Sequence, residues 1–575
     1  MLKKVVRREI VSDEHLSEAI NPKIKQIYAS RGVSSDEELT LATSLLAPVD
    51  SMKGLNQACQ VLHQALTLKQ SVFIIGDFDA DGATSTALMM KALALFGCEN
   101  YQFLVPNRFE YGYGLTAEIV DIAAKQGAQL LITVDSGISC HAGVERAKAL
   151  DIKVIVTDHH LAGKKLPPAD AIVNPNQPDC TFTSKAIAGV GVAFYFCLAM
   201  RKYLREKNWF NEHQITEPNI AQLLDLVALG TVADVVSLDA NNRILVEQGL
   251  KRIRAGVTRP GIQALIEVAG KNQQQLVASD FGFALGPRIN AAGRLDDMAF
   301  GINCLLADNL MDARVMAQEL DSLNKTRREI EHGMQQEAEN VLKALDFNED
   351  NLPHAIALFH QDWHQGVIGI VAGRLKEKYH RPTIVFAQSE DGLELKGSAR
   401  SIPGLHIRDL LEHIDSQQPE LIIKFGGHAM AAGLAIKTEN FQQFQQAFVE
   451  YAQLWLKEEL LQGTVVSDGE LALQSMTLPF AQLIRDSGPW GQNFPEPIFD
   501  DYFTLVQQRI VGEKHLKIVV EKNGQLFDGI AFNIDIKQWP NANIQQVHLA
   551  YRLDINEFRN KRSLQLMIEH ITALD

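Results

Sequence analysis

The alternation of apolar and polar positions is clearest between residues 71 and 160. There, short apolar runs alternate with helical stretches of about ten residues, a pattern typical of βαβ units and a parallel sheet. The apolar runs are SVFIIGDFD, YQFLVP, QLLITVDSG and KVIVTDHH. Because these runs are apolar at nearly every position, we expect helices to cover both faces of the sheet.

Residues 310–345 carry the strongest helical pattern, with apolar residues at roughly helical spacing and no proline to interrupt them. A helix of about 35 residues is about 50 Å long, which suits a rigid connector between two domains. A long coiled-coil helix is the alternative, although the apolar stripe is too irregular to favour it.

A second α/β pattern follows residue 353, with the strands HAIALFH, PTIVFAQ and LELKGSAR and the helix GVIGIVAGRLKEKY. From residue 464 the chain changes to short alternating strands, and Asn523-Gly524 between two of them predicts a tight hairpin. Five or six strands over about 110 residues indicate a small β-barrel.

These patterns predict an α/β protein with a parallel-sheet domain, a smaller α/β domain joined to it by a long helix, and a C-terminal barrel. The length of 575 residues agrees with three or four domains. The predicted boundaries are a mostly helical lead-in at 1–70, the parallel-sheet domain at 71–305, the connector helix at 306–348, the second α/β domain at 349–460 and the barrel at 464–575.

Composition excludes several classes of protein. Apolar residues make up 46% and charged residues 22% of the chain, as in ordinary globular proteins. No uncharged apolar run reaches about 18 residues, so we expect no membrane span. The six cysteines form no C-x-x-C pair, which argues against structural zinc and fits a reducing cytoplasm. The net charge of −15 argues against a broad nucleic-acid coat but leaves room for a local basic channel.

Acidic and histidine side chains follow three of the predicted strands. In an open parallel sheet, ligands bind beyond the carboxyl ends of the strands, so we expect these side chains to converge. They are Asp77, Asp79, Asp81, Asp135, Asp158, His159 and His160, with Asp234 after a later apolar helix.

Four carboxylates in one place create a charge problem. Two like charges about 4 Å apart repel by about 4 kcal/mol at an effective dielectric constant of about 20. Two divalent cations would remove this conflict among Asp79, Asp81, Asp135 and Asp234, and carboxylates with one imidazole favour manganese or magnesium. Asp77 shares a strand face with Asp79, so it is either a further ligand or an outer support. A single D-x-D is more often a solvated turn, but repetition at successive strand ends argues against that interpretation.

The motifs GDFDADGATSTA, TVDSG, VTDHH and ADVV stand in the order found in the DHH phosphoesterase family, which is named after a triplet like Asp158-His159-His160. Further motifs resemble the exonucleases of that family that are specific for single-stranded DNA. They are PNRFEYGYGL, GPRINAAGR, KGSARS, FGGHAMAAG and GPWGQNFPEPIF. The resemblance extends from about residue 70 to the end of the chain.

This resemblance implies a DHHA1-type second domain, an OB-fold barrel and two divalent ions, Mn²⁺ or Mg²⁺. In this family the metal ligands would be Asp79, Asp81, Asp135, His159 and Asp234. Asp135 would bridge the two ions. Asp158 would orient a histidine, and His160 would lie near the scissile phosphate as the catalytic acid or electrostatic stabiliser.

Substrate contacts are expected in the second domain. Ser398 and Arg400 alternate along a strand and could bind a terminal phosphate through charge-assisted hydrogen bonds. The glycines before His428 let backbone N–H groups approach a phosphate, although a packing corner between a helix and a strand is the alternative. Arg108 could join this set, although a lone arginine is usually a surface residue. The family resemblance implies that such residues capture a 5′ end.

Other residues have two possible roles. Tyr113 could stack on a base, worth about 1–3 kcal/mol, or pack within its loop. Arg288 and Asn290 point to phosphate or backbone contact. Trp490 and Phe494 are expected to seal a domain junction rather than to stack on bases.

The resemblance therefore implies a metal-dependent exonuclease that hydrolyses single-stranded DNA 5′→3′ to mononucleotides. It also implies a cytoplasmic role in recombination and repair, with single-strand binding protein and a helicase as partners and no membrane contact. One alternative is a DHH phosphodiesterase of short oligonucleotides or cyclic dinucleotides, against which the extra barrel argues. Another is a catalytically silent DHH relative, against which the intact acid–histidine set argues.

Overall fold

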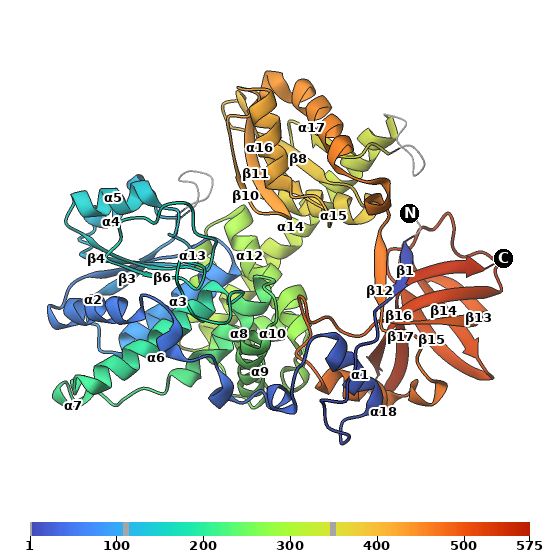
Figure 1. The fold of residues 1–575 in the computed structure, drawn as a ribbon, viewed down its shortest axis with the longest axis horizontal. Helices are drawn as coiled ribbons and strands as arrows, with labels where there is room; N and C mark the ends of the chain where they lie inside the picture. The colour runs from blue at the N-terminus through green and yellow to red at the C-terminus, as the bar shows by residue number, and fades with distance from the viewer. Residues whose placement is uncertain (1–2, 107–113, 345–351, 560, 575) are drawn as a thin grey trace. The chain divides into compact units, whose positions relative to one another are not determined.

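The computed structural model describes residues 3–106, 114–344, 352–559 and 561–574. The chain forms two compact units, in each of which segments distant in sequence come together (Figure 1). The larger unit comprises Ile10–Asn324 and Leu483–Glu496, and the smaller unit comprises Met1–Glu9, Lys325–Gln482 and Pro497–Asp575. In the described ranges, no helix combines the length and apolar character needed to cross a membrane.

A five-stranded parallel sheet forms the centre of the larger unit. Its strands are β2 (Val72–Ile75), β3 (Tyr101–Leu104), β4 (Leu130–Val134), β5 (Lys153–Thr157) and β6 (Ala171–Val173). They lie in the order β3-β2-β4-β5-β6. Every residue of β2 and β4 is buried, which confirms the prediction from their apolar runs that the sheet is covered on both faces.

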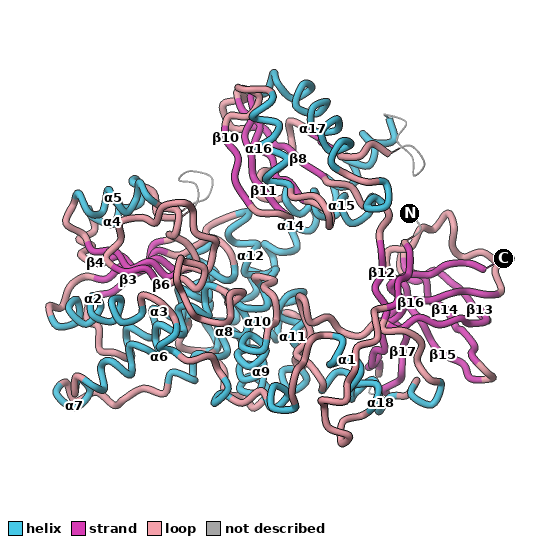
Figure 2. The backbone as a smooth tube through the Cα atoms, viewed as in Figure 1, coloured by secondary structure: helices cyan, strands magenta, loops and turns pink. Residues whose placement is uncertain are grey.

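Helices lie on both sides of this sheet (Figure 2). On one face are α4 (Ala117–Lys125) and α5 (His141–Ala149), and on the other are α2 (Leu55–Thr67), α3 (Ala80–Leu95) and α6 (Gly189–Glu206). The remaining helices of this unit are α1 (Pro22–Ser30), α7 (Trp209–Glu212), α8 (Leu224–Ala233), α9 (Ala240–Arg254), α10 (Pro260–Val268), α11 (Ala278–Asp280), α12 (Gly286–Leu295) and α13 (Met298–Leu306).

The long helix α14 (Leu310–Ala344) begins in the larger unit and ends in the smaller one, as its sequence pattern predicts. The lead-in contains a strand that the pattern did not reveal. This strand, β1 (Lys4–Arg7), pairs in parallel with β12 (Thr464–Ser467). Its sequence, KVVR, is too short to signal a strand by itself, and its partner lies far along the chain.

The smaller unit contains a second five-stranded sheet, in the order β10-β11-β9-β8-β7. Its strands are β7 (Ile356–Phe359), β8 (Thr383–Gln388), β9 (Glu394–Arg400), β10 (Lys424–Gly427) and β11 (Ala431–Lys437). Its helices are α15 (Ile368–Tyr379), α16 (Ile407–Gln417) and α17 (Phe441–Trp455). The glycine-rich stretch before and after His428 forms the antiparallel pair β10–β11 rather than a helix–strand corner.

The C-terminal strands close into a barrel in the order β13-β14-β15-β17-β16, as predicted. They are β13 (Phe499–Val511), β14 (His515–Lys522), β15 (Gln525–Ala531), β16 (Gln546–Phe558) and β17 (Lys561–Leu574), and α18 (Leu478–Asp486) precedes them. Asn523 and Gly524, with φ of 51° and 84°, make the tight turn from β14 to β15.

Two neighbouring aspartates of β13 organise polar contacts of the barrel. Asp500 accepts a hydrogen bond of 2.9 Å from Arg7, which attaches β1 to the barrel. Asp501 is fully buried, where it pairs with Lys522 and accepts a 2.6 Å hydrogen bond from the Tyr551 hydroxyl. Burial raises the pKa of Asp501, while the bonds from Lys522 and Tyr551 oppose that rise.

We expect Tyr551→Phe to destabilise the barrel by about 1.5–3 kcal/mol, because Asp501 loses a hydrogen bond in a buried site. Tyr502→Phe is the matched control on the same barrel, since the Tyr502 side chain is exposed and its ring stacking on His548 survives the change. Urea titrations of both variants measure the difference. Equal midpoints for the two variants would contradict the role assigned to the buried hydroxyl.

Candidate metal centre

The loop after β2 places three aspartates at the start of α3. Asp79 caps this helix, and its Oδ1 accepts hydrogen bonds of 3.0 Å from the N–H groups of Asp81 and Gly82. Gly82 allows the loop to fold back closely, because a Cβ atom there would lie 2.6 Å from the Cβ of the buried Asp77. The sequence D-x-D-x-D-G thus supplies both the acids and the turn that gathers them.

Asp81 is 1% exposed and is held by the first turn of α6. Its two carboxylate oxygens accept hydrogen bonds from the N–H groups of Gly189 (2.7 Å) and Val190 (2.9 Å). Burial and then the charge of Asp79 raise the pKa of Asp81 to about 7, against these two bonds. A cation bound beside this carboxyl group would favour its ionised form.

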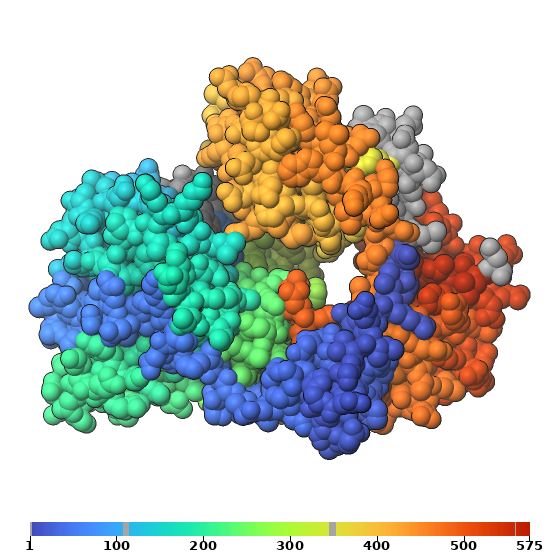
Figure 3. Space-filling model, viewed as in Figure 1, coloured from blue at the N-terminus to red at the C-terminus, as the bar shows by residue number. Residues whose placement is uncertain are grey.

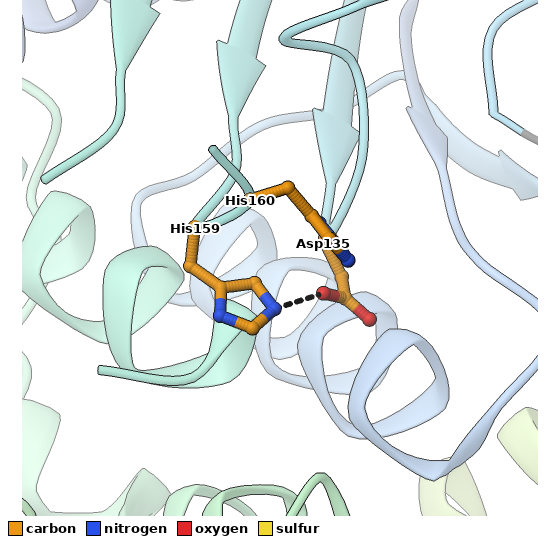
Figure 4. Close-up of side chains that lie close together, drawn as sticks. All are labelled: Asp135, His159 and His160. Carbon is orange, nitrogen blue, oxygen red and sulfur yellow. Dashed lines mark ion pairs between the residues drawn. The ribbon is translucent and has the colours of Figure 1, made fainter. Parts of the chain in front are cut away.

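Asp135 and His159 face each other from the ends of β4 and β5 (Figure 4). The Nε2 atom of His159 lies 3.0 Å from Oδ1 of Asp135 and 3.5 Å from Oδ2 of Asp234. Burial, followed by the negative charges of Asp81 and other nearby aspartates, raises the pKa values of Asp135 and Asp234 well above their usual range.

Asp158 is buried beside His160, and its Oδ1 lies 2.7 Å from the Nδ1 of that ring. Its Oδ2 accepts a 2.9 Å bond from the N–H of Ile138. Burial works against ionisation of Asp158, but the hydrogen bond and charge of His160 outweigh it and lower the pKa. Burial also disfavours the charged form of His160, yet Asp158 raises the pKa of His160 to about 8.

Potential metal-ligand atoms meet in three overlapping groups, each with its atoms within 4.8 Å of one another. The groups are Asp135–His159–His160, Asp81–His159–Asp234 and Asp77–Asp79–Asp135. Within the described residues, Oδ2 of Asp234 is buried and accepts no hydrogen bond. Buried oxygens with raised pKa values and a single ligating imidazole fit hard divalent cations such as Mn²⁺ or Mg²⁺.

Helix α12 supports the aspartate loop from outside. Oδ1 of Asn290 accepts a 2.7 Å bond from the N–H of Ala80, between two of the aspartates. A Cβ on Gly293 would lie 2.0 Å from the carbonyl oxygen of Phe78, so the helix and the loop touch through backbone atoms. The partner of Asn290 in the structure is thus an amide of the aspartate loop, and its predicted contact with the substrate stays a prediction.

The sequence patterns do not identify two asparagines of the NPNQP segment as residues of this site. Asn174 and Asn176 donate to the carbonyl oxygens of His160 and His159. An N-P-N turn directly after a strand next to the DHH strand was the available signal, but asparagine is so common in turns that it did not stand out.

The predicted nucleic-acid contacts lie in different parts of the chain. Arg288 is 9% exposed, pairs with Asp321 at 2.8 Å and donates to the carbonyl oxygen of Ala284 at 2.6 Å. These bonds give Arg288 a role within the larger unit, and its contact with nucleic acid stays a prediction. Arg108 and Tyr113 lie outside the described residues.

The phosphate-binding candidates of the smaller unit share one sheet. Nη1 of Arg400 donates a 3.1 Å bond to Oγ of Ser398, so both side chains lie on one face of β9. Gly433 of β11 is opposite Ser398 in the ladder and is exposed. On another side α15 lies close, because a Cβ on Gly369 would be 2.9 Å from Oγ of Ser398 and from Nη2 of Arg400. His428 is exposed at the turn between β10 and β11.

Trp490 and Phe494 lie in Leu483–Glu496, the later of the two chain segments that form the larger unit. Their rings stack at 5.2 Å, Tyr28 stacks on both, and the Arg243 guanidinium lies 4.2 Å from the Phe494 ring centroid. The Tyr28 hydroxyl donates to the carbonyl oxygen of Ser487 and Arg31 donates to that of Pro495, so this segment (orange in Figure 3) lies against the N-terminal residues (blue). The two rings therefore pack Leu483–Glu496 against the rest of the larger unit.

Residues 71–231 match the DHH family, N-terminal domain, residues 351–454 match the DHHA1 domain, and residues 467–570 match the RecJ OB domain. The chain is 57% identical to the single-stranded-DNA-specific exonuclease RecJ of Salmonella typhimurium, over 99% of both chains. The chain belongs to the RecJ family. It is also 57% identical to RecJ of Escherichia coli, over 98% of both chains.

Solved RecJ structures share the fold. The crystal structure of RecJ from Thermus thermophilus in complex with Mn²⁺ matches 100% of this chain and 80% of that one, with a TM-score of 0.82 and 28% identity. The corresponding Mg²⁺ complex gives a TM-score of 0.75, with 26% identity, and covers 100% of this chain and 79% of that one. The predicted architecture of DHH domain, long helix, DHHA1 domain and OB-fold barrel is thereby confirmed.

We expect Gly293→Ala to weaken binding of Mn²⁺, because the added Cβ must displace either α12 or the aspartate loop. Gly333→Ala is the matched control in another helix, since a Cβ there meets nothing within 4 Å. The control should stabilise α14 by up to about 1 kcal/mol, because alanine is the better helix former. Calorimetric Mn²⁺ titration of both variants measures the difference, and an unchanged affinity in Gly293→Ala would show that the loop does not depend on this contact.

Proposed function

We propose that this protein is a metal-dependent exonuclease that degrades single-stranded DNA from the 5′ end to mononucleotides. The observation that carries the proposal is the complete acid–histidine cluster at the strand ends of the sheet. Full-length similarity to enzymes named as single-stranded-DNA-specific exonucleases supports it. A phosphodiesterase for short oligonucleotides or cyclic dinucleotides would have no evident use for the OB-fold barrel.

In this proposal Asp79, Asp81, Asp135, His159 and Asp234 would hold two divalent ions, and Asp77 would support these ligands. When bound, such ions lower the pKa of a water molecule and stabilise negative charge on phosphoryl oxygens. The buried aspartates fix the ligand atoms in advance, so the ligands need little reorganisation as the substrate enters.

His160 acts on the substrate through its other ring nitrogen. Asp158 engages Nδ1, and in this proposal Nε2 acts on a phosphate oxygen or on the departing 3′ oxygen. Burial disfavours the charged form of His160, but Asp158 outweighs it and raises the pKa of the imidazole to about 8. His160 therefore supplies positive charge and a proton, and Asp158 keeps its ring oriented.

The 5′ end is captured in the DHHA1 domain in this proposal. Arg400 and Ser398 supply charge-assisted and neutral hydrogen bonds to a terminal phosphate, which approaches the sheet beside the exposed Gly433. His428, at the neighbouring turn, adds a further polar group. Arg108, Tyr113 and Arg288 remain predicted contacts to the strand.

The setting of the reaction is also a proposal. All six cysteines lie within the described residues and none forms a disulfide, which supports a reducing cytoplasm. Single-strand binding protein and a repair helicase would supply the substrate, in recombination and DNA repair. The family resemblance is the support for these partners.

Digestion of one single-stranded oligonucleotide with Mn²⁺, labelled in turn at each end, tests the function. We expect early release of the 5′ label as mononucleotide, while the 3′ label stays on shrinking products. Release of the 3′ label first would refute the polarity. Cleavage confined to very short oligonucleotides or cyclic dinucleotides would favour the phosphodiesterase.

Asp135→Asn should lower kcat/KM by more than about 100-fold. Loss of a residue that only supports a metal ligand already lowers metal affinity or activity by about 10–100-fold. Binding of the single strand should persist, because the change leaves the phosphate contacts in place. Asp121→Asn is the control, an exposed carboxylate that pairs with Arg146 at the surface. Equal hydrolysis by both variants would show that the metal centre is assigned wrongly.

Arg400→Ala should reduce the preference for a 5′-phosphorylated oligonucleotide over one with a 5′ hydroxyl by about 10-fold or more, the effect of losing one charged hydrogen bond of about 1.5–3 kcal/mol. Lys396→Ala is the matched control, because Lys396 is four residues earlier on the same strand and face. The ratio of kcat/KM for the two substrates is the measurement. An unchanged ratio in Arg400→Ala would place phosphate capture elsewhere.

A further inference from the structure

The DHH loop leaves the sheet immediately after β5, at the point where its ladder with β6 ends. The last ladder partners are Thr157 and Val173, and one more backbone bond, of 3.1 Å, joins the N–H of Asp158 to the carbonyl of Val173. The backbone groups of the next two residues must find other partners, because unpaired polar groups are costly in a buried region.

Side chains provide all four partners. The Oδ1 atom of Asp158 accepts from the N–H groups of His159 (2.7 Å) and His160 (3.0 Å). Nδ2 of Asn176 donates to the carbonyl oxygen of His159 at 2.6 Å, and Nδ2 of Asn174 donates to that of His160 at 2.9 Å. The backbone of the two histidines is therefore held on both edges.

The two asparagines are themselves fixed. Asn174 is fully buried, and its Oδ1 accepts a 2.7 Å bond from the N–H of Asn176. Asn176 also donates to the carbonyl oxygen of Lys185 at 3.1 Å, and the Lys185 ammonium donates to that of Pro175 at 2.6 Å. A turn bonded in this way has little freedom to follow the loop if the loop moves.

We propose that Asn176 and Asn174 are positioning residues that aim the two histidines of the DHH loop. Asn176 sets the backbone from which His159 reaches Asp135 and Asp234, and so sets metal affinity. Asn174 sets the backbone from which His160 reaches Asp158, and so sets turnover once the metals are bound. This inference rests on the proposed metal-dependent function.

The chemistry requires an amide at both positions. A carbonyl oxygen accepts but cannot donate, so its partner must bear an N–H or O–H group. Aspartate has nearly the same shape as asparagine, but its ionised carboxylate donates nothing and would face the carbonyl oxygen with like charge. Alanine removes the donor without adding a charge, so the two substitutions separate the missing bond from electrostatic repulsion.

Manganese titration of the full-length chain by calorimetry tests the role of Asn176 without any DNA. We expect Asn176→Ala to weaken Mn²⁺ binding about 10–100-fold, the range typical for partners of metal ligands. Asn176→Asp should weaken it as well, even though it adds negative charge near the site. Gln57→Ala is the matched control, because the Gln57 amide donates to the carbonyl oxygen of Asp170 just before β6, away from the histidines.

A merely structural role predicts a different result. In that case Asn176→Ala and Gln57→Ala would lower the melting temperature by similar amounts and would both bind Mn²⁺ as tightly as the unchanged chain. That outcome would overturn the proposal. If either Asn176 variant fails to fold, the other still decides, since both predict weaker binding.

Asn174→Ala should lower kcat at saturating Mn²⁺ by about 10-fold or more, with Mn²⁺ affinity within about threefold of the unchanged chain. Asn174→Ser is the second variant, because the buried position tolerates a small polar side chain better than a cavity. Unchanged kcat in a folded variant would overturn the role of Asn174. A failure of the proposed function is distinguishable, because the unchanged chain itself would then bind no Mn²⁺ or cleave no DNA.

Discussion

Repulsion among buried carboxylates is the constraint on which the rest of the larger unit depends. Asp81, Asp135 and Asp234 are drawn together at the strand ends, where burial and mutual charge raise their pKa values. Their burial and mutual repulsion both disfavour the ionised forms, so bringing them together costs free energy. The surrounding structure instead resists separation through helix N-termini, glycine contacts and asparagine bonds. It spends stability to keep a site ready for cations, as functional sites commonly do.

Binding of cations turns the destabilisation caused by the clustered carboxylates into a stabilisation. Ions that bind the folded chain and not the unfolded one stabilise it in proportion to the logarithm of their concentration. If the aspartates hold the ions as proposed, the same side chains destabilise the metal-free chain and stabilise the loaded one. Catalytic readiness and resistance to unfolding are consequently coupled through one set of side chains.

The parallel sheet and the barrel could be predicted because their signals are local. A four-residue apolar strand such as β2, followed at once by acids, identifies both a buried strand and its functional end. The pairing of β1 with β12 could not be predicted, because neither strand carries information about the other. The sequence predicted that the charged residues gather at one place, but not which side chains support them. Asn174 and Asn176 act through carbonyl groups that every residue has, so no pattern of residue types marks their partners.

The exchange of segments between the two units has a consequence for how the chain is made. The first nine residues belong to the unit that is finished by the last ones, and the larger unit is completed only by Leu483–Glu496. A ribosome releases the chain from its N-terminus, so β1 leaves long before β12 or the barrel exists. In the larger unit, Tyr28 likewise cannot stack on Trp490 and Phe494 until those residues have been synthesised. Neither unit is complete until Glu496 has been synthesised, so the nascent chain carries both units unfinished until these later segments emerge.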